Sequence, residues 1–141
     1  MPGALARLVE GLDSRPEVDV VYSDTYRLLD EQRVGRWHSG PAYHLTSMQI
    51  VGACFLYRRQ VWDRVGGYDD GAFLVEDYEW WVRAWKAGFR FEHLPEVWYE
   101  YRIHGQSLGE THGRDRVHQK KLEVQRRYFR RGQLWLWKLG L

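Results

Sequence analysis

The sequence predicts an α/β fold in a single continuous domain. Segments with apolar residues at helical spacing alternate along the chain with short runs rich in β-branched and aromatic residues. A chain of 141 residues is long enough to bury one hydrophobic core. Helices interleaved with strands in one domain are typical of a mixed sheet with flanking helices.

The first part of the chain predicts a helix, a strand and a hairpin. Residues 2–12 place four apolar side chains on one helical face, and the turn before Pro16 ends that helix. Residues 18–24 are short, β-branched and apolar, as expected for a strand that ends at Asp24. Residues 26–37 predict an extended hairpin that turns near Asp30.

The middle of the chain predicts three short elements. Residues 43–49 are expected to form a short helix or a loop, followed by an apolar strand over residues 53–57. Residues 59–65 predict a brief helix that ends at Gly66, where a positive backbone dihedral costs little.

Residues 76–87 predict the most distinctive helix, and Gly88 stands in the position expected for its C-terminal cap. The helical period assigns four residues to its apolar stripe, namely Tyr78, Trp81, Val82 and Trp85. It assigns four others to the solvent-facing side, namely Glu79, Arg83, Lys86 and Arg90. Glu79 and Arg83 are also spaced for a helical ion pair.

The last third predicts strands and then a basic helix. Residues 89–94 and 97–101 form two strands separated by Pro95, and a polar loop follows them. Residues 114–131 return to a helix rich in Arg and Lys, and residues 134–139 form a Trp-rich tail too short to span a membrane. This region suits either an anionic membrane surface or a partner, or is an ordinary solvated helix.

The composition excludes several classes of protein. The formal net charge of +2 gives no strong basic field, so we expect no nucleic-acid partner. The single cysteine, Cys54, cannot form an intramolecular disulfide, which suggests a reducing compartment and a buried packing role. We see neither a signal peptide nor an apolar run of membrane-spanning length. We therefore expect a cytoplasmic protein, with the inner face of the membrane as an alternative.

Two adjacent carboxylates, Glu76 and Asp77, open the aromatic-rich helix. Acidic residues in a first helical turn are common for capping reasons alone, because they satisfy backbone N–H groups and the helix dipole. A carboxylate in this place can also act as a general base beside aromatic surfaces on which sugar rings stack. The residues alone leave both interpretations open.

Four segments follow one another along the chain in a distinctive order and at a distinctive spacing. They are residues 52–59 (GACFLYRR), 65–69 (VGGYD), 76–88 (EDYEWWVRAWKAG) and 101–107 (YRIHGQS). In this arrangement the chain resembles the C-terminal, acceptor-side half of a family 2 glycosyltransferase of the GT-A fold. The resemblance covers about residues 2–107. It implies a partial GT-A fold over residues 1–107, followed by residues 108–141 as the basic helix and its tail.

The resemblance also implies roles for individual residues. Asp77 would be the catalytic base that deprotonates the acceptor hydroxyl, and Glu76 would orient it or contact the acceptor. His104 would reach the metal or the pyrophosphate, although a lone histidine is more often structural or simply exposed. The planar guanidinium of Arg102 is the alternative group to meet phosphate. Two further positions would border the acceptor site, namely Gly52 and Ala53. For Gly52 and Ala53, small residues that allow close packing are an equally good interpretation.

Trp80 and Asp24 each leave a choice between a functional and a structural role. Trp80 would project beside the carboxylate pair as a sugar platform, although core packing is the simpler expectation. Asp24 stands after a strand, where α/β sheets often place ligands. We do not assign Asp24 to an Asp-x-Asp metal motif, because Tyr22 replaces the first acid.

In family 2 enzymes the Asp-x-Asp motif precedes a segment similar to residues 2–8, so here it would lie upstream of Met1. We therefore expect a divalent metal, Mn²⁺ or Mg²⁺, only together with a donor-binding half. That half would come from an extended reading frame or a companion chain, and the isolated chain would have negligible activity. The expected substrates are a nucleotide-sugar donor and a glycan, lipid-linked or cell-envelope acceptor, with inversion at the sugar carbon. The alternative is a non-catalytic carbohydrate-binding or interaction module.

Overall fold

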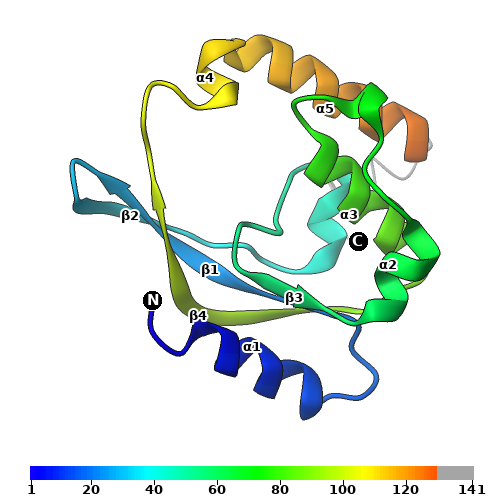
Figure 1. Ribbon diagram of the computed structural model, residues 1–141. Helices are drawn as coiled ribbons and strands as arrows, with labels where there is room; N and C mark the ends of the chain where they lie inside the picture. The colour runs from blue at the N-terminus through cyan, green and yellow to red at the C-terminus, as the bar shows by residue number, and fades with distance from the viewer. Residues whose placement is uncertain (130–141) are drawn as a thin grey trace, which may run out of the picture.

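The computed structural model describes residues 1–129 and has an α/β architecture (Figure 1). Its α-helices are α1 (Ala4–Asp13), α2 (Arg59–Val65), α3 (Glu76–Lys86), α4 (Leu108–Thr111) and α5 (Arg114–Tyr128). Its strands are β1 (Val20–Leu29), β2 (Gln32–Trp37), β3 (Phe55–Tyr57) and β4 (Phe91–Arg102). Two 3₁₀ helices complete it, η1 (Ala42–Thr46) and η2 (Asp70–Ala72). The predicted fold class is confirmed.

Strand β1 is the centre of a mixed sheet. Strand β4 pairs with it in parallel along one side, from Val20 opposite Phe91 to Leu28 opposite Arg102. On the other side of β1, strand β3 pairs antiparallel with the beginning of β1 and strand β2 pairs antiparallel with the end of β1. Residues of both halves of the chain thus meet around one strand.

Helices cover both faces of this sheet (Figure 1). Helix α1 lies against one face and packs its buried leucines with apolar residues of the strands. Helix α3, with α2 and α5 beside it, covers the other face and belongs to the larger apolar cluster. Burying each large apolar side chain contributes roughly 1.5–3 kcal/mol. Three fully buried side chains illustrate that cluster, namely Tyr22, Tyr78 and Trp80.

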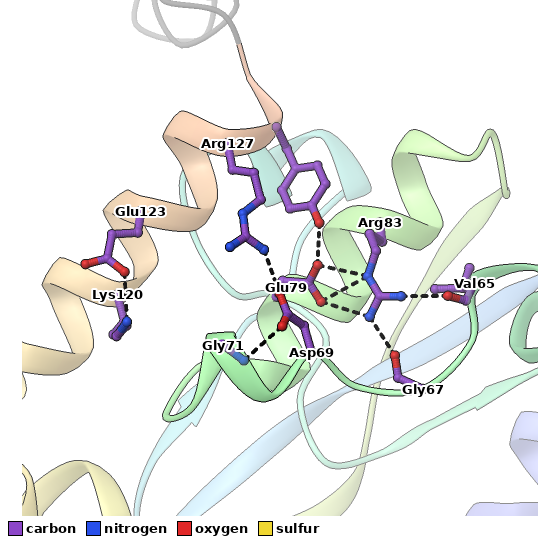
Figure 2. Close-up of polar contacts among 10 residues, drawn as sticks. Val65, Gly67, Asp69, Gly71, Glu79, Arg83, Lys120, Glu123 and Arg127 are labelled. Carbon is purple, nitrogen blue, oxygen red and sulfur yellow. Dashed lines mark hydrogen bonds and ion pairs between the residues drawn. The ribbon is translucent and has the colours of Figure 1, made fainter.

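Helix α3 is buried on more sides than its sequence indicates. Glu79 was predicted to face solvent, but its side chain is buried under α5. Its carboxylate pairs with Arg83 at 2.8 Å and accepts a hydrogen bond of 2.5 Å from the Tyr128 hydroxyl. Arg83 in turn donates to the carbonyl groups of Val65 and Gly67 (Figure 2). The predicted Glu79–Arg83 ion pair is confirmed, but the prediction that the Glu79 side chain faces solvent was wrong.

The strand boundaries also differ from the prediction. Strand β1 does not end at Asp24 but continues to Leu29, and it turns into β2 through Asp30 and Glu31. Both turn residues have positive φ, as a tight hairpin with the right twist requires. The two predicted strands around Pro95 are one continuous strand, β4. The register shifts opposite Pro95 accommodate its missing N–H group.

Two further predictions concern short or terminal elements. The segment around residues 43–49 forms the 3₁₀ helix η1. The basic helix ends at Tyr128, because Phe129 is already extended. The Trp-rich tail over residues 134–139 lies outside the described residues. None of the helices within residues 1–129 has the length and apolar character needed to cross a membrane.

Candidate functional site

A pocket of about 450 Å³ lies beside the beginning of α3. Its wall is mostly apolar and aromatic, and it combines segments that are far apart in the sequence. The lining residues used below are Arg27, Trp37, Gln49, Gly52, Ala53, Tyr68, Asp77, Trp81 and Tyr101. Of all the residues that line this pocket, only Arg27 and Asp77 carry a full charge at neutral pH.

Asp77 lies in the first turn of α3 and is solvent-exposed on the pocket wall. One carboxylate oxygen accepts a hydrogen bond of 2.6 Å from the backbone N–H of Tyr78. The other accepts a hydrogen bond of 2.8 Å from the side-chain amide of Gln49. The first bond satisfies a helix N-terminal donor, so the capping interpretation describes part of what Asp77 does. The carboxylate nevertheless faces the pocket and retains further acceptor capacity there.

Glu76 lies next to Asp77 but does not line the pocket. Its carboxylate oxygen Oε2 is buried and has no hydrogen-bond partner within residues 1–129.

Burial, with further contributions from Tyr57, Asp77 and Glu76, raises the pKa of Tyr68 at the pocket rim. The Tyr68 hydroxyl therefore stays protonated at neutral pH and can donate a hydrogen bond to a ligand.

Gly52 and Ala53 line the pocket just before β3, and their role at an acceptor site stays a prediction. A Cβ atom on Gly52 would lie 3.4 Å from the hydroxyl oxygen of Thr25. That hydroxyl is buried and has no hydrogen-bond partner among the described residues. A side chain at position 52 would therefore contact β1 at Thr25.

Trp80 does not project beside the carboxylates, so its role as a sugar platform is wrong, and the simpler expectation of core packing is confirmed. It is only 2% exposed, and its indole N–H donates to the Gly66 carbonyl at 2.7 Å. The aromatic pocket surface comes from other residues, which the sequence did not single out: Trp37, Tyr68, Trp81 and Tyr101. The available signal was that Tyr68 and Tyr101 belong to two of the four segments on which the family resemblance rests.

Arg102 and His104 lie outside the pocket. Arg102 is at the end of β4, and its guanidinium forms an exposed ion pair of 3.0 Å with Glu31. His104 is exposed in the following loop. In the described part of the chain, no three His, Cys, Asp or Glu side chains assemble into a metal-binding group. The residues present therefore do not form a metal site, and a metal role for His104 stays a prediction.

Asp24 lies in the middle of β1 at the centre of a buried polar network. One oxygen accepts the Ser39 N–H at 2.9 Å and lies 2.6 Å from His93 Nε2. The other accepts two bonds from the Arg36 guanidinium and lies 3.0 Å from His38 Nδ1. Burial alone would raise the pKa of Asp24, but these partners outweigh it and hold that pKa below its usual value. Asp24 therefore has a structural role as the shared acceptor of this buried network.

A family profile described as glycosyl transferase family group 2 matches residues 2–137, almost the full length of the chain. A search of curated proteins found no match. The profile covers the pocket and the beginning of α3, and the mixed sheet with flanking helices is consistent with a partial GT-A fold. These findings support glycosyl transfer as the general activity, and the chain belongs to glycosyl transferase family group 2.

Proposed function

We propose that this chain is the acceptor-side part of an inverting glycosyltransferase. It would transfer a sugar from a nucleotide-sugar donor to a hydroxyl group of a glycan, lipid-linked or cell-envelope acceptor. The observation that carries this proposal is the exposed Asp77 carboxylate on the wall of an aromatic-lined pocket. Family membership supports the reaction class, and the pocket supports the position of the acceptor.

In this proposal Asp77 is the general base. An alcohol is a poor nucleophile at neutral pH, so its attack benefits from a positioned proton acceptor. As the acceptor oxygen bonds to the anomeric carbon, its proton passes to the Asp77 carboxylate. The bond to the nucleoside diphosphate breaks at the same time, and the diphosphate leaves with the electron pair. A single in-line displacement of this kind inverts the configuration at the sugar carbon.

Gln49 has a supporting role in this scheme. Its amide donates to the Asp77 oxygen at 2.8 Å and fixes the orientation of the carboxylate. Its own carbonyl oxygen is buried and has no hydrogen-bond partner in the region from residue 1 to residue 129. Trp37 and Tyr101, which are both exposed, offer flat apolar surfaces on which a sugar ring can stack.

The donor side belongs to the proposal as well. The sequence contains no Asp-x-Asp motif, so a preceding segment or a companion chain would supply the metal and nucleotide site. We accordingly expect negligible turnover from this chain alone and measurable turnover from a frame or complex that includes the donor site.

An activity assay on the donor-competent protein tests the role of Asp77. General-base assistance contributes about 10²–10⁴-fold, so Asp77→Asn is expected to lower kcat by a factor in that range. The matched control is Asp63→Asn, which removes an exposed carboxylate on α2 that pairs with Arg59. The control should retain full turnover. Equal turnover by Asp77→Asn and the unmodified enzyme would remove Asp77 from the mechanism.

The aromatic pocket also fits a second function, namely a non-catalytic carbohydrate-binding module. Such a module would bind glycans without a nucleotide or a metal. Calorimetric titration of the donor-competent protein with a nucleotide-sugar and Mn²⁺ distinguishes the two functions. Measurable affinity for the nucleotide-sugar favours the transferase, whereas glycan binding without it favours the module.

A further inference from the structure

Arg27 is the one cationic residue among those that line the pocket. It lies on β1, is solvent-exposed, and shares the pocket wall with Asp77. Neither the capping of α3 nor the proposed role of Asp77 uses this guanidinium. Its surroundings nevertheless set it apart from the other arginines of the sheet.

Three arginines on neighbouring strands each have an acidic partner. Arg33 pairs with Glu100 at 2.6 Å, Arg36 with Asp24 at 2.8 Å, and Arg102 with Glu31 at 3.0 Å. Arg27 has no hydrogen bond or ion pair with any residue from 1 to 129, Asp77 included. The sheet therefore supplies an acid to each of the other three and leaves the arginine at the pocket without one.

The space beside Arg27 is open. Its register partner on β2 is Gly35, and a Cβ atom at that position would meet nothing within 4 Å. Its register partner on β4 is Tyr101, an exposed aromatic residue that also lines the pocket. A glycine within a strand often marks a place where a ligand approaches the backbone closely. Arg27 thus lies between an open flank on β2 and an aromatic residue on β4.

We infer that the pocket accepts an anionic acceptor, whose carboxylate or phosphate group pairs with Arg27. This inference rests on the proposed function, because it assigns the acceptor class at the same site. The planar guanidinium matches carboxylate and phosphate oxygens through two parallel hydrogen bonds. Asp77 repels the same anion, so the charged group turns toward Arg27 and a neutral hydroxyl toward Asp77. The two opposite charges orient the acceptor for attack.

Binding titrations with simple sugars test the inference without turnover. The probes are D-glucose, D-glucuronate and D-glucose 6-phosphate, with dissociation constants measured by ligand-observed NMR at low salt. Hydrogen bonds to charged groups predict that both anionic sugars bind about tenfold more tightly than glucose. Arg27→Gln should remove this preference, and Arg27→Lys should retain part of it. Higher salt should weaken it, because the site is exposed.

The matched control is Arg33→Gln, which removes an exposed arginine of the same hairpin that already pairs with Glu100. It should leave the preference unchanged. Equal binding of the three sugars, no binding of either anion, or a preference that survives Arg27→Gln would overturn the inference. So would UDP binding that depends on Arg27 without any preference among the sugars, because it would assign the guanidinium to the donor's diphosphate. None of these results changes the expected loss of turnover in Asp77→Asn.

Discussion

Two aspartates on neighbouring elements show how the environment decides what a carboxylate can do. Asp24 is fully buried, and both of its oxygens accept hydrogen bonds from charged or backbone donors. Asp77 is exposed, with one amide partner and one backbone partner. A proton arriving at Asp24 would break a buried ion pair, whereas a proton arriving at Asp77 displaces a single neutral donor at most. Only Asp77 is suited to accept a proton during a reaction.

Asp24→Asn should destabilise the protein. In either orientation the new amide would turn its NH₂ group toward a donor, the Arg36 guanidinium or the Ser39 N–H, and the arginine would lose its counter-charge. Breaking such pairs typically costs about 3–5 kcal/mol, and we expect about 2–4 kcal/mol because Arg36 remains partly exposed. Urea unfolding at pH 7 measures the loss. Asp63→Asn, which removes an exposed pair, should stay within about 0.5 kcal/mol of the unmodified protein.

The sequence could predict part of the site, and the reasons are visible at single residues. Asp77 was identifiable because it opens a helix within a recognisable order of motifs, and Gly52 because it precedes a strand. Trp80 was misplaced because helical periodicity cannot separate a pocket wall from a core when both flank one helix. Its neighbour Trp81 is only 3% exposed, yet it lines the pocket. Arg27 was missed because nothing in a sequence shows which arginine lacks an acid.

At the scale of elements, α3 is the helix on which both the core and the site depend. Its first turn carries Asp77 to the pocket, and two residues later Glu79 anchors α5. The prediction that Glu79 faces solvent failed because the cover is supplied by Tyr128, 49 positions further along the chain. A second contact of α5 is the ion pair of Arg127 with Asp69, which directly precedes η2, at 2.6 Å (Figure 2).

Glu79→Gln should loosen α5 from α3. The amide oxygen can still accept from Arg83 Nε and the Tyr128 hydroxyl, but the amide NH₂ then faces Arg83 Nη2, which is itself a donor, and a partly buried guanidinium loses its counter-charge. We expect a loss of about 2–4 kcal/mol in the free energy of unfolding. The substitution should also raise the rate of amide hydrogen exchange more in α5 than in α1. Glu10→Gln, at an exposed pair on α1, is the control and should change neither quantity. Equal exchange in α5 before and after the Glu79 change would contradict this account.

Strand β4 shows a second limit of prediction at this scale. A proline inside a strand pattern normally argues for a break, and two strands were expected. The strand continues because β4 pairs only with β1 within residues 1–129, so the missing N–H of Pro95 costs little at this edge. The Pro95 carbonyl also accepts a hydrogen bond from Arg36. The α/β class was predictable from periodicity, but strand continuity depends on edge position, which only the folded sheet defines.

At the scale of the whole molecule, the pocket exists because the sheet joins distant segments. Strand β1 supplies Arg27, β2 supplies Trp37, β4 supplies Tyr101 and α3 supplies Asp77. The family profile spans the same elements and extends through α5. A division of the chain at residue 107 stays a prediction, although Val124 of α5 and Phe129, which directly follows α5, belong to the main apolar cluster.

The free energy of unfolding of the whole molecule should be roughly constant at intermediate pH and should fall at both low and high pH. The pKa of Asp24 is lower in the folded state than its unfolded value of about 3.9, so its contribution is present above that pH. This contribution is lost as the pH falls through the folded pKa. Burial raises the pKa of Tyr78 from 10.0 to about 12 and also raises that of Tyr22, so the folded state binds protons more tightly. Stability should therefore fall as the pH rises above about 10.

Thermal unfolding followed by circular dichroism between about pH 3 and pH 11 checks both limbs, since a shift of two pKa units corresponds to on the order of 2–3 kcal/mol. Tyr78→Phe should lower the free energy of unfolding at intermediate pH, because the hydroxyl donates to the Leu45 carbonyl at 2.7 Å. It should also flatten the alkaline limb and leave the acid limb unchanged, whereas Asp24→Asn should flatten the acid limb alone. Each variant thus separates one titrating group from the general loss of stability. An alkaline limb of unchanged steepness in Tyr78→Phe would show that the loss above pH 10 arises from other groups.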